Sequence, residues 1–100
     1  MDMIIVVGSA TAILGQEGAV RALSLAHVRR SRTEPGCIAH DVTTDCENSS
    51  RFVFVEYWRD VPALMDHFAL DDSKAFVRAL RPLLSEDPDM KIFHSEPVPI

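Results

Sequence analysis

The stretch FVFVEYW at residues 52–58 is the sequence feature that most restricts the fold. Alternate side chains of a β-strand point to opposite faces. One face would carry Phe52, Phe54, Glu56 and Trp58, and the other Val53, Val55 and Tyr57. Both faces are therefore apolar, and one also holds a carboxylate. The stretch predicts a strand with layers on both sides, in which Glu56 and Trp58 serve either a core or the wall of a site.

Four strands and two helices follow from periodicity and turn signals along the chain. The predicted strands are residues 3 to about 13, 37 to about 44, 51–58 and 90 to about 96, and the predicted helices are residues 16 to about 31 and a second one after Asp60. The turn Glu34-Pro35-Gly36 ends the first helix, and the polar segment DCENSS joins the second and third strands as an antiparallel hairpin.

The second helix has a clear start and an irregular course. Asp60 is a suitable N-cap, and Pro62 falls in the first turn, where a missing N–H is harmless. The apolar stripe is interrupted near residues 70–73, where a second helical segment can begin, and Pro82 weakens or ends the helix.

The order β-α-β-β-α-β over residues 1–100 predicts one α+β domain with a ferredoxin-like fold. In this topology both helices cover one face of a four-stranded antiparallel sheet. Residues 4–7 and 52–58 are apolar on the other face as well, so that face needs a cover. We therefore expect a homodimer in which two sheets pack together as a dimeric α+β barrel.

Charge and hydropathy restrict the partners and the location. The formal net charge of -5 argues against binding to nucleic acid. The apolar start carries Asp2 and no Lys or Arg, which is unlike a signal peptide, and no apolar run reaches the ~20 residues of a membrane span. Cys37 and Cys46 flank a predicted strand too long for a disulfide between them. We expect a cytoplasmic protein without a membrane partner.

Three side chains are candidates for chemistry, each with a structural alternative. Trp58 ends a strand where the chain enters a helix, which is a common place for the mouth of a pocket. The alternative is a core residue whose indole N–H donates to a nearby acceptor. His67 lies at the flank of the apolar stripe and is a proton carrier or a boundary residue. Arg78 is an anion-binding residue or an exposed arginine.

The remaining histidines give no metal motif. His27 lies on the apolar stripe of the first helix and is read as a core residue, while His40 and His94 are expected on opposite edge strands. No zinc-finger spacing, glycine-rich phosphate loop or G-x-S-x-G elbow is found in the sequence. No metal site is therefore predicted.

The runs SRTEPGCIAHDV, SRFVFVEYWRDVPALMDHF and KAF resemble the antibiotic biosynthesis monooxygenase family over about residues 3–96. The most specific elements are E-P-G and E-x-W with a histidine nine residues after the tryptophan. The resemblance implies a small dimeric ferredoxin-like protein. Some members oxygenate quinol-like aromatics with O₂ and use no metal or flavin, because a deprotonated hydroquinone can itself pass an electron to O₂.

Branches of this family imply different site residues. Trp58 and Arg78 match the actinorhodin-pathway branch, but its asparagine and tyrosine fall on Phe54 and Leu64. An iron-binding histidine of the haem-degrading branch falls on Val77, which argues against haem degradation.

The quinol monooxygenases and a sugar phosphate isomerase share Glu56 and His67, and the isomerase lacks a tryptophan at position 58. The resemblance is thus closest to the quinol branch. The leading hypothesis is a cofactor-independent monooxygenase acting on a small hydroquinone-like aromatic. The rivals are a small keto sugar phosphate isomerase and a non-catalytic dimer that binds an apolar ligand or a partner protein.

The roles expected under the leading hypothesis are specific. His67 accepts the phenolic proton, Arg78 steadies the anion, and Glu56 orients His67 or a water molecule. The residues expected to line the pocket are Trp58, Phe54, Leu64 and Phe68.

Overall fold

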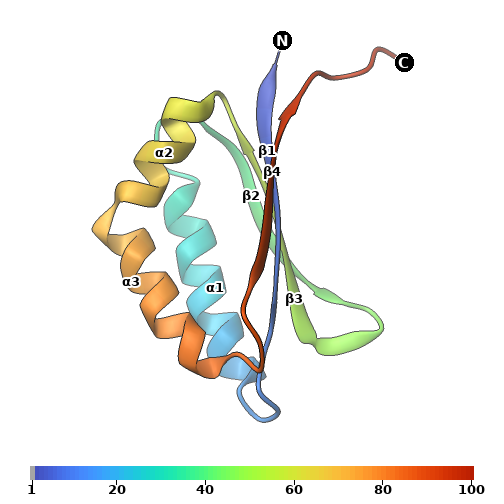
Figure 1. The fold of residues 1–100 in the computed structure, drawn as a ribbon, viewed down its shortest axis with the longest axis vertical. Helices are drawn as coiled ribbons and strands as arrows, with labels where there is room; N and C mark the ends of the chain where they lie inside the picture. Colours follow the sequence, from blue (N-terminus) through green and yellow to red (C-terminus); the bar gives the residue numbers. More distant parts are fainter. Residues whose placement is uncertain (1) are drawn as a thin grey trace.

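The computed structural model describes residues 2–100, and Figure 1 shows a sheet with all its helices on one side. The strands are β1 (Met3–Thr11), β2 (Cys37–Asp45), β3 (Asn48–Trp58) and β4 (Asp89–Ser95). The helices are α1 (Glu17–Ser31), α2 (Val61–Ala69) and α3 (Asp71–Leu80), followed by the 3₁₀ turn η1 (Arg81–Leu83). The α+β ferredoxin-like fold predicted from the element order is confirmed.

The sheet has the strand order β2-β3-β1-β4, and every neighbouring pair is antiparallel. His40 and His94 lie on the two edge strands, as predicted. The register places His40 opposite Glu56, Glu56 opposite Val6, and Val6 opposite Ile92. These four side chains form one row across the sheet, on the face that the helices cover.

The second predicted helix is two helices. Asp60 caps α2 by accepting a hydrogen bond from the Ala63 N–H at 2.9 Å, and the chain becomes extended at Leu70 before α3 begins. Pro82 lies within the 3₁₀ turn that follows α3. The interruption in the apolar stripe therefore marks a true break.

The core consists of two apolar clusters on the helix side of the sheet. One surrounds Phe52 and Phe54, and the other surrounds Trp58 and Leu64. On β3, Glu56 lies between Phe54 and Trp58 and is itself only 5% exposed. A buried polar group therefore separates the two clusters, at the level where the candidate site lies.

The turn before β2 is packed against the start of α2. Gly36 has a φ of 83°, which side chains rarely tolerate, and a Cβ there would lie 2.5 Å from the Cβ of Ala63. The Arg59 N–H also donates to the Gly36 carbonyl at 2.8 Å. Only glycine allows this close approach, which brings Glu34, two residues earlier in the chain, near α2.

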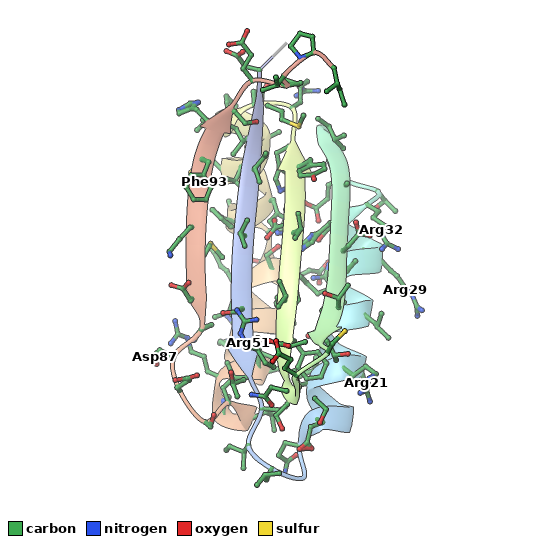
Figure 2. The ribbon with its side chains drawn as sticks, turned by 90° about the vertical axis from the view of Figure 1, so that its right-hand side faces the viewer. Arg21, Arg29, Arg32, Arg51, Asp87 and Phe93 are labelled. Carbon is green, nitrogen blue, oxygen red and sulfur yellow. The ribbon has the colours of Figure 1, made fainter. Side chains whose placement is uncertain are left out.

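The other face of the sheet carries no layer in the described chain, and Figure 2 views it directly. Val53, Val55 and Tyr57 point to this face and are half-buried, whereas Phe93 is 49% exposed. Within residues 2–100, no helix is both long enough and apolar enough to cross a membrane.

Candidate functional site

A cavity of about 150 Å³ lies between the sheet and the helices, with β1 and β3 on one side and α3 on the other. Its walls are mostly apolar, and its polar end carries three histidines and a glutamate. Gly8 of β1 lines the cavity, and a Cβ at this position would lie 3.3 Å from the Asp89 carbonyl oxygen. The missing side chain of Gly8 therefore leaves part of the space open.

His67 of α2 is 3% exposed and forms the closest carboxylate contact of the site. Its Nδ1 lies 2.7 Å from Oε1 of Glu34, the residue that the Gly36 turn brings to α2. A carboxylate accepts the Nδ1 proton in this arrangement, so the lone pair of Nε2 is left for another partner. The pair has the geometry of a histidine base with an orienting carboxylate.

Glu56 does not contact His67 in this way. Its Oε1 accepts a hydrogen bond from the Trp58 indole N–H at 2.9 Å, and its Oε2 lies 3.6 Å from His40 Nε2. Burial raises the pKa of the Glu56 carboxyl, and the hydrogen bond from Trp58 counteracts part of that rise. Of the two roles expected for Glu56, orienting His67 is wrong because Glu34 occupies that position, and orienting a water molecule stays a prediction.

Four of the seven predicted site residues line the cavity, namely His67, Glu56, Phe54 and Phe68. The other three do not, which corrects their expected placement. Trp58 and Leu64 are fully buried in a core cluster, and the indole packs against the His67 ring with centroids 4.7 Å apart. Arg78 is exposed on α3.

Arg81 rather than Arg78 borders the cavity. It is the one lysine or arginine that lines it in the described chain, and its Nη1 lies 3.6 Å from Asp87. Arg81 lies three residues beyond Arg78, in the 3₁₀ turn.

His27 and His40 were not predicted as site residues, yet both line the cavity beside His67. One ring nitrogen from each of the three histidines lies within 4.8 Å of the others. Sequence spacing gave no sign of this cluster, because its members come from α1, β2 and α2. The absence of a recognisable motif was thus a poor guide to whether metal-binding side chains would meet.

Burial governs the protonation of these two histidines. Desolvation, followed by the charges of neighbouring histidines, lowers the pKa of His27 to about 3. Desolvation, followed by the charges of His67 and Arg32, lowers the pKa of His40 to about 3 as well. Both imidazoles are therefore neutral at pH 7.

Other proteins share this sequence pattern and fold. The family model described as antibiotic biosynthesis monooxygenase matches residues 3–79. An uncharacterised protein of Synechocystis is 33% identical over 92 residues, which is 92% of this chain and 63% of that protein. The chain thus spans about 63% of the length of this curated relative.

Solved structures agree in fold. A Deinococcus radiodurans protein, provisionally assigned as an antibiotic biosynthesis monooxygenase, superposes with a TM-score of 0.91 at 24% identity, covering 97% of both chains. The protein PA3566 of Pseudomonas aeruginosa has a TM-score of 0.84 at 28% identity, covering 99% of this chain and 97% of its own. Because the family model covers most of the chain, this protein belongs to the antibiotic biosynthesis monooxygenase family.

Proposed function

We propose that this protein is a monooxygenase that oxidises a single-ring, hydroquinone-like aromatic with O₂ and uses no bound cofactor. The observation that carries the proposal is the Glu34–His67 pair at the end of an apolar cavity. An apolar cavity of about 150 Å³ is the size that accommodates a benzene ring. Aromatic side chains of Phe54, Phe68 and Phe76 line it and suit a flat apolar ring.

Proton transfer is the first step that the geometry supports. A phenolic hydroxyl in the cavity would donate its proton to Nε2 of His67, and the Glu34 carboxylate would stabilise the imidazolium through Nδ1. Burial lowers the pKa of His40 to about 3, so its imidazole is a poor proton acceptor at pH 7. We therefore assign the proton to His67 and leave His40 as a hydrogen-bond acceptor.

Oxidation follows from the chemistry of the anion. The deprotonated substrate passes one electron to O₂, and the resulting semiquinone and superoxide combine at a ring carbon to form a C–O bond. Protonation gives a hydroperoxide, and loss of the ring C–H proton with O–O cleavage releases water. One oxygen atom enters the ring and the other leaves as H₂O, so hydroquinone and O₂ give hydroxyquinone and water. The apolar walls keep solvent from the radical pair.

The isomerase hypothesis is less well supported. A sugar phosphate needs cationic groups near its phosphate. Arg81 is the one lysine or arginine bordering the cavity among residues 2–100, and it lies beside Asp87. The apolar walls also give a sugar few hydrogen-bond partners. Non-catalytic ligand binding remains an outcome that an assay must be able to detect.

We also propose that the uncovered sheet face packs against a second copy of the chain. The register places Phe93, Ile5 and Tyr57 side by side on this face, with Val7 and Val55 in a neighbouring row. Burying such a surface would be favourable at roughly 25 cal/mol per Å² of apolar area. Wild-type protein should sediment as a dimer and Val55→Lys as a monomer, whereas a monomeric wild type would contradict the proposal.

Oxygen uptake by tag-free, chelator-treated protein tests the proposed reaction. The panel should contain single-ring hydroquinones and larger naphthohydroquinones, and uptake should be confined to the former. His67→Ala should lower kcat by about 10²–10⁴-fold, the usual range for a lost general base. Glu34→Gln should lower it as well, and His94→Ala, an exposed histidine outside the cavity, is the matched control. Substrate binding without oxygen uptake would favour the non-catalytic alternative.

A further inference from the structure

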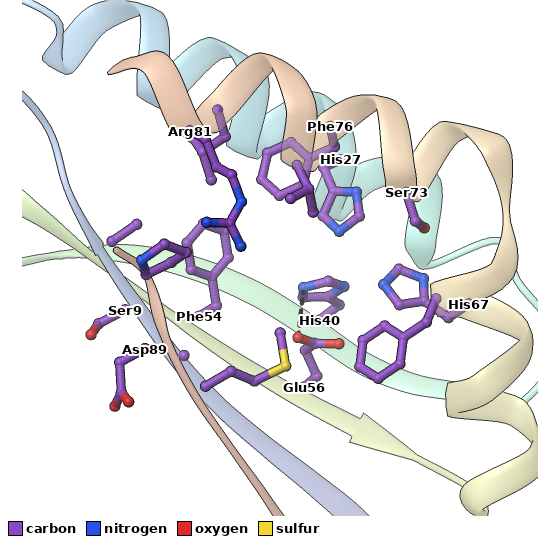
Figure 3. Close-up of a pocket in the computed structure, with 17 residues that line it drawn as sticks. Ser9, His27, His40, Phe54, Glu56, His67, Ser73, Phe76, Arg81 and Asp89 are labelled. Carbon is purple, nitrogen blue, oxygen red and sulfur yellow. Dashed lines mark ion pairs between the residues drawn. The ribbon is translucent and has the colours of Figure 1, made fainter. Parts of the chain in front are cut away.

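Three buried histidines meet at the polar end of the cavity, whereas the proposed proton transfer uses His67 alone. His27 comes from α1, His40 from β2 and His67 from α2, and all three are at least nine-tenths buried. Figure 3 shows the rings grouped around a common space at the end of the cavity. Their ring centroids lie between 5.1 and 5.7 Å apart.

Two of the three histidines keep a ring nitrogen with no hydrogen bond in the described part of the chain. His67 uses Nδ1 for Glu34, which leaves Nε2. His40 directs Nε2 toward Glu56, and its Nδ1 is buried with no hydrogen-bond partner among residues 2–100. A buried nitrogen without a partner is costly and uncommon. Two converging lone pairs of this kind suit a cation or a hydrogen-bond donor.

We propose that His27, His40 and His67 bind one divalent transition-metal ion, with the fourth coordination position facing the apolar cavity. Imidazole nitrogens favour Zn²⁺, Cu²⁺, Ni²⁺ or Fe²⁺ over Mg²⁺ and Ca²⁺. Three protein ligands with one open position is the arrangement of accessible metal sites. The order of intrinsic affinities places Cu²⁺ above Zn²⁺ and Ni²⁺.

The surroundings of two ligands support this assignment. Metal-bound histidines commonly donate their other N–H to a carboxylate, which orients the ring and raises its basicity. Glu34 does this for His67 at 2.7 Å, and Glu56 lies 3.6 Å from His40 Nε2. Both carboxylates are largely buried, so they can offset the charge of a divalent ion.

Closing the site needs only a small movement. With metal–nitrogen bonds of about 2.0–2.1 Å, tetrahedral ligands lie about 3.4 Å apart. The candidate nitrogens lie within 4.8 Å of one another. Rotating the side chains so that each nitrogen moves by less than about 1 Å would bring the nitrogens to that spacing.

Arg30 opposes metal binding by the third proposed ligand, His27. Its Nη2 lies 2.7 Å from His27 Nδ1 and donates to it, which places the ring proton on Nε2. Metal binding would require this proton to leave or to change sides, and Arg30 to turn away. Asp72, whose Oδ2 lies 3.7 Å from Arg30 Nε, offers a partner on the exposed side. Removing the Arg30 charge should therefore strengthen metal binding.

Metal binding and the proposed monooxygenase reaction both need Nε2 of His67, so they exclude each other. A bound ion occupies Nε2 of His67, the atom assigned to accept the phenolic proton. Adding the metal back to the chelator-treated enzyme would thus inhibit oxygen uptake. The two proposals can fail separately, because metal binding is measured without turnover.

Titration calorimetry of the tag-free chain with ZnCl₂ and CuCl₂ at pH 7 tests the site directly. We expect one ion per chain. His40→Gln and His27→Gln should each weaken metal affinity by more than about 100-fold. This exceeds the 10–100-fold loss typical of changes to residues that only support a ligand, such as Glu34→Gln. Arg30→Gln should bind more tightly, and His94→Ala should match the wild type. The single tryptophan, Trp58, packs against His67, so Cu²⁺ should quench its fluorescence.

Wild-type protein also gives a test that needs no variant to fold. Co²⁺ held by three imidazoles in a tetrahedral site should produce visible d–d absorption, whereas Co²⁺ in water absorbs only weakly. The proposal is overturned if neither Zn²⁺ nor Cu²⁺ binds at micromolar concentration. It is equally overturned if binding survives both cluster variants, or if Arg30→Gln weakens it.

Discussion

Acidification of the metal-free protein should destabilise it steeply because two histidines are buried in the neutral form. Burial lowers the folded-state pKa of His27 and His40 from 6.5 to about 3. Between these values the unfolded chain binds protons that the folded chain does not. Stability therefore rises with pH across this window and is lost as pH falls from 6.5 toward 3.

The size of the effect depends little on the folded pKa, provided that it lies well below 5. For one histidine, protonation of the unfolded chain between pH 7 and pH 5 costs about 1.9 kcal/mol by proton linkage. Two such groups remove roughly 4 kcal/mol, a large part of the 5–15 kcal/mol typical of a domain. Glu56 acts in the opposite direction where its raised pKa overlaps this range.

Urea unfolding followed by circular dichroism at pH 7, 6 and 5, with chelator present, measures this loss. His40→Gln should remove about half of the pH dependence, and His94→Ala should leave it unchanged. His27→Gln gives a second comparison, because His40 lies 3.6 Å from Glu56 and its replacement also changes the surroundings of that carboxyl. Equal pH dependence in wild type and His40→Gln would refute the reasoning that His40 is buried neutral.

Three further changes test the packing around the cavity. Trp58→Phe keeps a ring but removes the N–H that Glu56 accepts, so it should cost about 1–3 kcal/mol in urea unfolding; no loss would show that the bond contributes nothing. Gly8→Val should fill the cavity beside Asp89 and raise KM for aromatic substrates with little change in fold by circular dichroism; an unchanged KM would place the substrate elsewhere. Leu64→Ala should cost about 2–5 kcal/mol in urea unfolding and leave KM nearly unchanged, because Leu64 is fully buried and lies outside the cavity; a large KM increase would return it to the pocket wall.

The fold was predictable because its elements are specified locally. Alternation in residues 52–58 identified the central strand and its two faces correctly, and Asp60 marked the start of α2. Element ends were less certain: β3 begins at Asn48 rather than near residue 51, since polar residues continue the hairpin beyond the apolar run.

Only some of the residues at the site could be predicted, because the side chains come from separate segments and meet through tertiary packing. His40 faces Glu56 through the hairpin register, but an irregularity between Thr44 and Asp45 shifts the pairing, so counting outward from the turn at residues 46–47 would not have found this contact. The contact of Glu34 with His67 depends on the positive φ of Gly36 and its approach to α2. No pattern within one segment contains that information.

The arginine and tryptophan assignments show the limit of transferring residues by resemblance. The resemblance implied a site role for Trp58, yet its side chain is buried and supports Glu56 and His67 from behind the cavity. The resemblance also implied a site role for Arg78, which is exposed on α3. An aligned position fixes the residue type, whereas burial and helix geometry decide what the side chain reaches.

Oxygen consumption by chelator-treated protein with a single-ring hydroquinone is the most direct test of the central claim. We expect stoichiometric uptake of one O₂ per hydroxyquinone formed, a loss of about 10²–10⁴-fold in kcat for His67→Ala, and wild-type rates for His94→Ala. Uptake that is absent over the whole panel, or equal in wild type and His67→Ala, would contradict the assignment of the Glu34–His67 pair as the base of a monooxygenase.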